Sequence, residues 1–216
     1  MSRPITTYLY KNQDEPIPMD RSDFYDEQIA IFQKTGKPTR MVAVAQVLLF
    51  TPDKQLIIQK RSRKKGHNVG LLDKTIGAHV MFGDTPFYTV MKAALQELSV
   101  PAFILDSAED FRKTLRLLED HTGRSAFVQF VDSKTVNIPK VIDGKEVLVG
   151  NRYYFFLGLY NGTLNPEQTH VSSVVYKDIQ DLEREIEAKP EDFTEDIRFF
   201  LSKYRTEILH FLKQLT

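Results

Sequence analysis

The stretch that decides the fold is GAHVMFGDTPFYTVMKAALQELSV, residues 77–100. It opens as a short apolar strand, turns at residues 82–85 and continues as a helix to about Leu98. Thr85 suits the N-cap of that helix, because its hydroxyl can accept a hydrogen bond from the first turn. Pro86 suits the first helical position, where a missing N–H costs nothing. The stretch therefore predicts a strand, a turn and a helix in that order.

One face of the predicted helix, together with the turn before it, carries the candidate functional residues. Positions 93, 96 and 97 share that face because they lie three and four residues apart. They hold Ala93, Gln96 and Glu97, and Asp84 lies in the turn before the helix. Carboxylate oxygens are ligands that Mg²⁺ prefers, and this face and the turn before it carry carboxylates on Glu97 and Asp84, with the neutral amide of Gln96 beside Glu97. The structural alternative is a solvated Glu97 beside an alanine that lets the helix pack closely.

With these residues in place, the stretch resembles the Nudix box, in which Gly, Glu, Arg-Glu and Glu-Glu recur at a fixed spacing. The spacing holds without a gap, and the box positions are occupied by Ala78, Asp84, Lys92, Ala93, Gln96, Glu97 and Ser99. The resemblance implies a Nudix-type α/β/α sandwich, an α+β fold with a mixed sheet and a C-terminal helical extension. It also implies Mg²⁺ or Mn²⁺ over a diphosphate, with Glu97 and Asp84 as candidate catalytic residues and metal ligands and Gln96 as a neutral third ligand. Because Ala93 and Gln96 replace carboxylates, the resemblance predicts a degenerate box with weakened metal binding.

A basic run, Lys60–Lys65, precedes this box. Together with Leu72-Asp73 and Gly77-Ala78-His79, it resembles the Nudix branch that includes isopentenyl-diphosphate isomerase. In that branch the residues matching Arg61 and Lys65 hold the substrate diphosphate, so both are expected to bind one here, with His79 as a further substrate contact. A solvated surface is the alternative for the run, and a partnered strand histidine for His79. Nucleic acid is disfavoured because no aromatic residues interleave the run.

Composition narrows the classes of function. The chain has 216 residues, a formal net charge of zero and no cysteine. A global basic footprint for nucleic acid is therefore absent, as are disulfides, thiolate metal sites and a Cys nucleophile. Isomerase activity is disfavoured because those enzymes use a Cys in proton transfer. No apolar run reaches the ~18 residues of a membrane span and no signal peptide is visible, so a cytoplasmic protein without membrane partners is expected.

The remaining pattern predicts a mixed α/β chain with helices outside a sheet. A helix from Ser22 ends before Gly36, and the C-terminal helix is amphipathic and expected to dock on the core. The expected strands are 41–50, 55–61, 74–81, 125–133, 146–149, 152–160 and 171–177, and the later helices are 107–120, 178–188 and 194–214. Residues 1–40 are assigned as an N-terminal arm and helix, and 41–216 as the Nudix-like domain, in one compact domain overall.

Two functions stay open at this point. The first is a divergent Nudix hydrolase that attacks the diphosphate of a nucleoside diphosphate linked to another moiety with metal-activated water. The second is a catalytically inactive Nudix-fold module that binds a nucleotide or diphosphate ligand, or a protein partner. An acid elsewhere could replace the residue lost at Ala93, and the candidates are Glu109, Asp110, Glu119 and Asp120. A homodimer through residues 152–160 is also left open, against burial of that strand inside the sheet.

Overall fold

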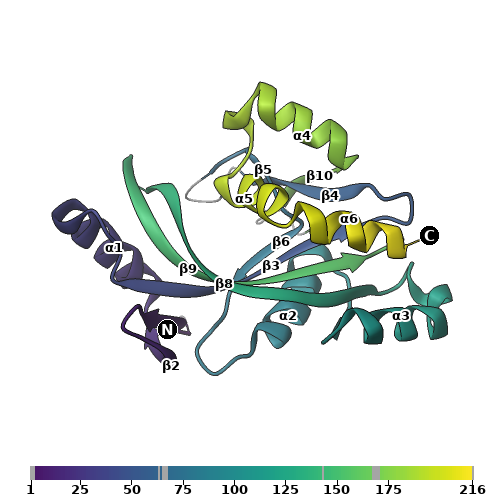
Figure 1. The fold of residues 1–216 in the computed structure, drawn as a ribbon, viewed down its shortest axis with the longest axis horizontal. Coiled ribbons are helices and arrows are strands. Elements are labelled where there is room, and N and C mark those ends of the chain that lie inside the picture. Colours follow the sequence, from purple (N-terminus) through teal and green to yellow (C-terminus); the bar gives the residue numbers. More distant parts are fainter. Residues whose placement is uncertain (1–2, 63, 65–67, 143, 167–170, 216) are drawn as a thin grey trace.

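A curled mixed sheet with helices against both of its faces forms the architecture (Figure 1). The computed structural model describes residues 3–62, 64, 68–142, 144–166 and 171–215. The α+β class and the mixed sheet expected from the sequence are confirmed. Within the described residues, no helix is long and apolar enough to cross a membrane.

The elements follow the chain in alternating groups. The strands are β1 (Ile5–Leu9), β2 (Asn12–Met19), β3 (Arg40–Phe50), β4 (Leu56–Arg61), β5 (Leu72–Asp73), β6 (Ile76–His79), β7 (Ala102–Leu105), β8 (Ala126–Ile142), β9 (Lys145–Leu159) and β10 (Val171–Lys177). The helices are α1 (Arg21–Thr35), α2 (Pro86–Leu98), α3 (Ala108–Leu117), α4 (Ile179–Ala188), α5 (Glu195–Lys203) and α6 (Arg205–Gln214), with short 3₁₀ turns at Glu119–His121 and Pro190–Asp192.

Strand β3 is the centre of the sheet, whose main path runs β10-β4-β3-β9-β8-β7. It pairs in parallel with β9 and antiparallel with β1, β4 and β6. A strand with neighbours on both edges and helices on both faces is buried on every side, which explains its nearly continuous apolar sequence. Strand β9 lies between β3 and β8, so residues 152–159 are inside the sheet.

The alternation of side chains along β3 divides the interior into two cores. Its even-numbered apolar residues join the core that includes α5 and α6, and three of its odd-numbered ones join the core that includes α2. The first set is Val42, Val44, Leu48 and Phe50, and the second is Ala45, Val47 and Leu49. Each fully buried large aliphatic or aromatic side chain stabilises the fold by roughly 1.5–3 kcal/mol. The second core fixes α2 on the sheet through Val90, Ala94 and Leu98.

Two β-strand predictions were too short. Strand β8 continues to Ile142, and the two stretches 146–149 and 152–160 form one strand, β9. The distal part of β8 contains Pro139, which argues against a strand in a sequence because it lacks a donor for the ladder. Gly150 keeps β9 continuous, since a Cβ there would lie 2.5 Å from the carbonyl oxygen of Arg40 on β3.

The prediction of one helix over 194–214 was wrong, because the chain leaves helical geometry at Tyr204 between α5 and α6. The Tyr204 hydroxyl donates a 3.0 Å hydrogen bond to Asp132 of β8, and its ring stacks on Phe155 with centroids 4.4 Å apart. The helix therefore breaks where a side chain is tied to the sheet, although the buried apolar positions continue from α5 into α6. The predicted docking of the C-terminal helices is confirmed by the buried Phe200 and Phe211.

The N-terminal segment begins with the β1–β2 hairpin and continues into α1. Asp20 caps α1 by accepting from the Ser22 N–H at 2.9 Å, and Gly36 ends it with a positive φ of 66°. Strand β1 pairs with β3, and Phe24 of α1 is fully buried in the core beside it. We infer from this shared core that residues 1–40 and 41–216 fold as one compact domain.

Candidate functional site

A cavity of about 510 Å³ opens between α2, the β3–β6 part of the sheet, α1 and the start of α5. Among the described residues, it is lined by five of those predicted for the site: Arg61, His79, Asp84, Gln96 and Glu97. The sixth, Lys65, lies outside the described residues. The cavity therefore brings the basic run and the box helix to one place, although they are separated by strands β5 and β6.

Helix α2 begins as the sequence predicts and presents its box face to the cavity. Thr85 accepts a 3.1 Å hydrogen bond from the Tyr88 N–H, and Pro86 occupies the first turn. Ala93 is buried at the base of the cavity, whereas Gln96 is exposed and Glu97 half-buried at its wall. The small side chain of Ala93 lets α2 pack closely on the sheet and offers no oxygen to a ligand.

Asp84 is held by an arginine that the sequence analysis did not single out. The Arg3 guanidinium donates two hydrogen bonds to the Asp84 carboxylate, at 2.8 and 3.1 Å, and a third to the Phe82 carbonyl at 3.0 Å. The Asp84 side chain is only 9% exposed, whereas that of Arg3 is 51% exposed. The hydrogen bond to Asp84 raises the pKa of Arg3 further above its ordinary value. One carboxylate of the box is thus neutralised within the chain.

The donor set of this cavity does not fit a Mg²⁺ or Mn²⁺ site. These hard cations need several oxygen ligands, with carboxylates supplying the charge. Ala93 supplies none, Gln96 is neutral, and Asp84 is bound by Arg3. Among the residues that the structure describes, no group of three or more His, Asp or Glu side chains is placed to hold a metal ion.

The candidate replacements for the lost acid do not reach this cavity either. Glu119 and Asp120 line a different cavity beside α3. Glu109 pairs with Lys113 along α3 at 2.6 Å, and Asp110 accepts from the Ser107 hydroxyl at 2.6 Å. Their contacts place these side chains around α3, so none of them completes a carboxylate cluster at α2.

Cationic side chains outnumber carboxylates around the cavity. Among its described lining residues, six are basic (Arg21, Arg61, Lys64, Lys74, Lys92, Lys140) and three are acidic (Asp84, Glu97, Asp196). Asp84 is paired with Arg3, and Asp196 with Lys74 at 2.8 Å. Lys64 and Lys92 form no ion pair within the described residues. The lining is therefore suited to an anion.

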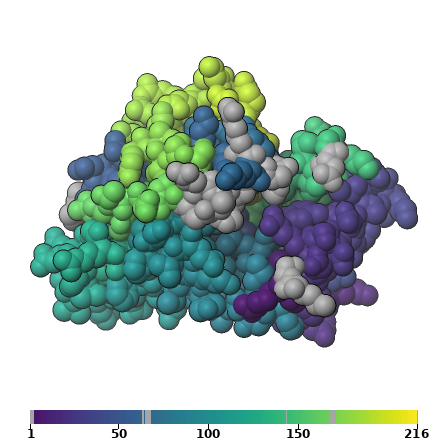
Figure 2. All heavy atoms as spheres, turned by 180° about the vertical axis from the view of Figure 1, so that it is seen from behind, coloured from purple at the N-terminus to yellow at the C-terminus, as the bar shows by residue number. Residues whose placement is uncertain are grey.

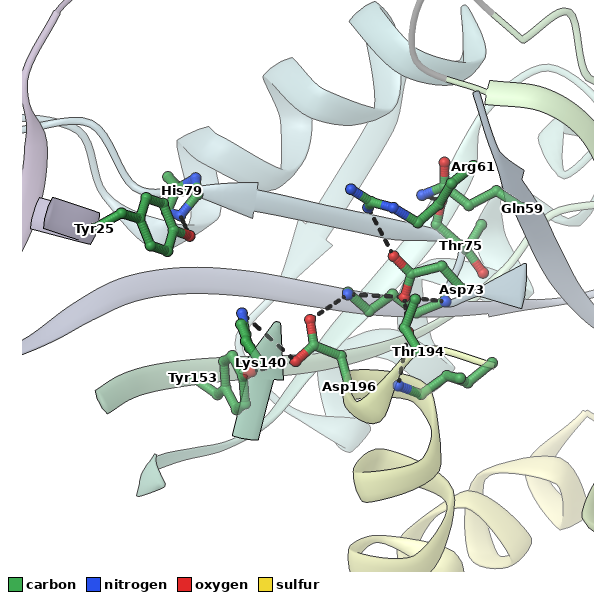
Figure 3. Close-up of polar contacts among 12 residues, drawn as sticks. Tyr25, Gln59, Arg61, Asp73, Thr75, His79, Lys140, Tyr153, Thr194 and Asp196 are labelled. Carbon is green, nitrogen blue, oxygen red and sulfur yellow. Dashed lines mark hydrogen bonds and ion pairs between the residues drawn. The ribbon is translucent and has the colours of Figure 1, made fainter. Parts of the chain in front are cut away.

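A buried charge network forms one end of the site (Figure 3). Arg61 donates to Asp73 at 3.0 Å. The Lys74 ammonium forms two ion pairs, with Asp73 at 2.9 Å and with Asp196 at 2.8 Å. Thr194 donates a further 2.7 Å hydrogen bond to Asp73. The side chains of Asp73 and Lys74 are 2% and 4% exposed, so their charges depend on one another rather than on water.

The network keeps its groups ionised despite burial. Burial alone would raise the pKa of Asp73, but the charges of Lys74 and Arg61 outweigh it and lower that pKa. Burial acts in the same direction on Asp196, where Lys140 and Lys74 hold the pKa well below its ordinary range. For Lys74, burial lowers the pKa, yet Asp196 and Asp73 raise it above its ordinary value. The network thus fixes Arg61 at the cavity through a charged anchor.

The opposite end of the site comes from α1. Figure 3 shows Tyr25 beside His79, away from the network, and the Tyr25 hydroxyl lies 3.1 Å from His79 Nε2 in a hydrogen bond. The Arg21 guanidinium lies 6.0 Å from the centre of the Tyr25 ring. The sequence offered no signal for Arg21 and Tyr25, because they precede the box by more than one strand and meet it only in the fold.

Several proteins of known structure share this arrangement of sheet, turn and helix. DR0079 from Deinococcus radiodurans superposes with a TM-score of 0.54 at 16% sequence identity, over 87% of this chain and 90% of that one. The MutT protein from Methanosarcina mazei superposes with a TM-score of 0.52 at 11% identity, over 77% of this chain and 94% of that one. The chain has the Nudix fold.

A third structure with the Nudix fold is a bifunctional NMN adenylyltransferase/ADP ribose pyrophosphatase from Francisella tularensis, complexed with AMP and a Mn ion. It superposes with a TM-score of 0.50 at 11% identity, over 87% of this chain and 47% of that one. No family model and no curated protein matches the sequence. The Nudix-fold likeness concerns architecture, so the chemistry has to come from the side chains of the cavity.

Proposed function

We propose that this chain is a Nudix-fold binding module for a small anionic ligand that contains a diphosphate, such as a nucleoside diphosphate linked to another moiety. The observation that carries the proposal is the excess of cations in the cavity, where two of the three described carboxylates are already neutralised by Arg3 and Lys74. A diphosphate supplies the missing negative charge.

The cations suit a diphosphate in different ways. Arg61 is anchored by Asp73, which keeps its planar fork in one orientation, and such a fork can bind two phosphate oxygens at once. Lys64, which follows β4, and Lys92 of α2 both line the cavity and act as point charges. Lys65 follows Lys64 in the basic run, and we keep it in the proposal as a fourth diphosphate contact. His79 and Tyr25 would contact the moiety beyond the diphosphate.

Hydrolysis is the second candidate, because Gln96 and Glu97 line the cavity on the box helix and one similar fold carries an ADP ribose pyrophosphatase. In this reading Glu97 and Asp84 hold Mg²⁺ or Mn²⁺ with Gln96. Such a site needs more carboxylate oxygens than these residues supply, and Asp84 would have to leave Arg3. We therefore rank hydrolysis below binding without turnover.

Calorimetric titration tests the proposal with two probes that cannot be cleaved at the bond of interest, α,β-methylene-ADP and methylene diphosphonate. Binding of either probe that weakens in Lys92→Met but not in Lys203→Met, a change on the exposed side of α5, supports the module. Absence of binding to both probes sinks it. In parallel, a hydrolysis panel of nucleoside diphosphate derivatives with Mg²⁺ and Mn²⁺ compares the natural chain with Ala93→Glu/Gln96→Glu. Turnover by the natural chain, lost in Glu97→Gln, would establish the hydrolase instead.

A further inference from the structure

The first described residues of the chain run along the box turn. The Thr6 N–H donates to the Val80 carbonyl at 2.8 Å, and the Phe82 N–H donates to the Pro4 carbonyl at 2.9 Å. Ile5 forms a bridge with Met81 between these two bonds. This ladder extends β1 toward α2 and sets the backbone of residue 3 beside the turn. In Figure 2 the purple N-terminal segment lies against the blue-green part of the molecule.

Arg3 reaches Asp84 from that fixed position. Its guanidinium forms two hydrogen bonds with the carboxylate and one with the Phe82 carbonyl, so all three contacts lie within the turn that precedes α2. The Asp84 side chain, which lines the cavity, is 9% exposed beneath it. A guanidinium carries one positive charge, so it neutralises one carboxylate, and its fork geometry fits the two carboxylate oxygens.

The charge of Asp84 decides what the cavity can bind. An unpaired carboxylate at the wall would repel a diphosphate, and the repulsion would be strong because the site is partly shielded from water. A divalent cation from solution could offset that charge only where the carboxylate is free, and in the natural chain Arg3 occupies it. Arg3 offsets the charge from within the chain instead, and Lys92 of α2 adds a further cation to the lining of the cavity.

We infer that Arg3 takes over the charge role of a divalent metal ion at Asp84, so that the cavity accepts a diphosphate ligand without metal, and that removal of Arg3 makes binding metal-dependent. The inference rests on the proposed binding function and adds to it the source of the positive charge. It makes the N-terminal segment that carries Arg3 part of the site. This segment then determines that the site prefers a diphosphate without a bound metal ion.

The test measures the affinity of methylene diphosphonate by calorimetry, in EDTA and in Mg²⁺. The natural chain is expected to bind equally in both conditions. Arg3→Ala is expected to bind about tenfold more weakly in EDTA and to recover in Mg²⁺, since the freed carboxylate then needs a cation. Arg3→Ala/Asp84→Asn is expected to bind equally in both conditions again, because the carboxylate is gone. Arg3→Lys should keep part of the metal independence.

The matched control is Arg205→Ala. Arg205 also pairs with a carboxylate through two hydrogen bonds, to Glu183 at 2.7 and 3.2 Å, but this pair lies on α6 and α4, away from the cavity. Arg205→Ala should therefore leave the affinity unchanged in both conditions. Circular dichroism of each variant verifies that the fold is kept.

A second readout uses Mn²⁺ alone, followed by electron paramagnetic resonance. Arg3→Ala is expected to bind Mn²⁺ more tightly than the natural chain, and Asp84→Asn in the Arg3→Ala background should remove that gain. The inference is overturned if the natural chain binds the diphosphonate only with metal, or if Arg3→Ala changes neither metal dependence nor Mn²⁺ affinity. If the natural chain binds neither the diphosphonate nor α,β-methylene-ADP in either condition, the proposed function fails, and the Mn²⁺ measurement still decides the role of Arg3.

Discussion

The two groups of charges at the cavity differ in how completely they are paired. Asp73 and Lys74 are buried and the Asp196 side chain is 13% exposed, and the contacts among them give each charge an opposite partner. Lys64 and Lys92 reach the cavity and form no ion pair within the described residues. Burying an isolated charge is costly, so a buried charge must be paired, whereas a charge in contact with water needs no partner. The paired group holds the fold, and the unpaired group is available to a ligand.

Replacing Lys74 with Met is the strongest way to break this comparison. The change leaves two carboxylates buried near each other without their shared cation, which costs about 3–5 kcal/mol of the free energy of unfolding. Urea denaturation measures it against Lys92→Met, which should stay within about 0.5 kcal/mol of the natural chain. If Lys74→Met is tolerated as well as Lys92→Met, the distinction between the two groups is wrong.

Lowering the pH tests the same network, and its expected effect on stability is smaller than that of Lys74→Met. The pKa values of Asp73 and Asp196 are lowered in the folded chain, so the unfolded chain binds more protons below its own Asp pKa of about 3.9. The stability that they contribute is present above that pH and is lost as the pH falls through the lowered values. Urea midpoints measured from pH 6 down to about pH 3 should fall, and they should fall less steeply in Asp196→Asn. Equal slopes would contradict the lowered pKa of Asp196.

Lys64→Met and Lys92→Met test the unpaired group of charges. Each removes a charge-assisted contact with a diphosphate and should weaken binding of α,β-methylene-ADP by about fivefold, near 1 kcal/mol. The urea midpoint should not move, because neither ammonium has a partner to lose in the described chain. A fall in stability with unchanged affinity would show that these lysines belong to the fold.

The smallest expected effect is at the end of the cavity formed by α1. Tyr25→Phe removes the hydrogen bond between the hydroxyl and His79 Nε2 and should cost about 0.5–1 kcal/mol of the free energy of unfolding. Thermal and urea denaturation measure it. A loss of several kcal/mol would mean that this pair is part of the buried framework, like Asp73 and Lys74.

Local signals made much of the fold predictable from the sequence. Helix α2 follows from Thr85, Pro86 and the apolar spacing behind them, and β3 follows from its continuous apolar run. Strand β7 and the distal half of β8 were missed, because they are short or polar and exist through pairing with a neighbour. The break at Tyr204 likewise depends on Asp132 and Phe155, which lie far away in the chain.

The candidate site divides in the same way. Arg61, Asp84 and Glu97 could be singled out because their spacing resembles a known motif, and their roles in binding stay predictions. Arg3 and Tyr25 could not be singled out, since a lone arginine or tyrosine in a polar N-terminal stretch carries no local signal. The pairing of Lys74 with Asp196 was equally hidden, because it joins the residues between β5 and β6 to α5, which lie far apart in the sequence. Contacts between distant segments leave no periodic pattern in the sequence from which they could be predicted.

The parallel pairing of β3 with β9 has a consequence for folding in time. It joins Met41 to Gly150 and Phe50 to Leu159, so it closes a long loop, which slows folding. During synthesis, β3 leaves the ribosome long before the strand that covers its edge. Until residue 159 has emerged, an apolar strand edge stays open to other chains, and aggregation competes with folding in that interval. We expect growing chains that end before β9 to need a chaperone, and complete chains to lose that need.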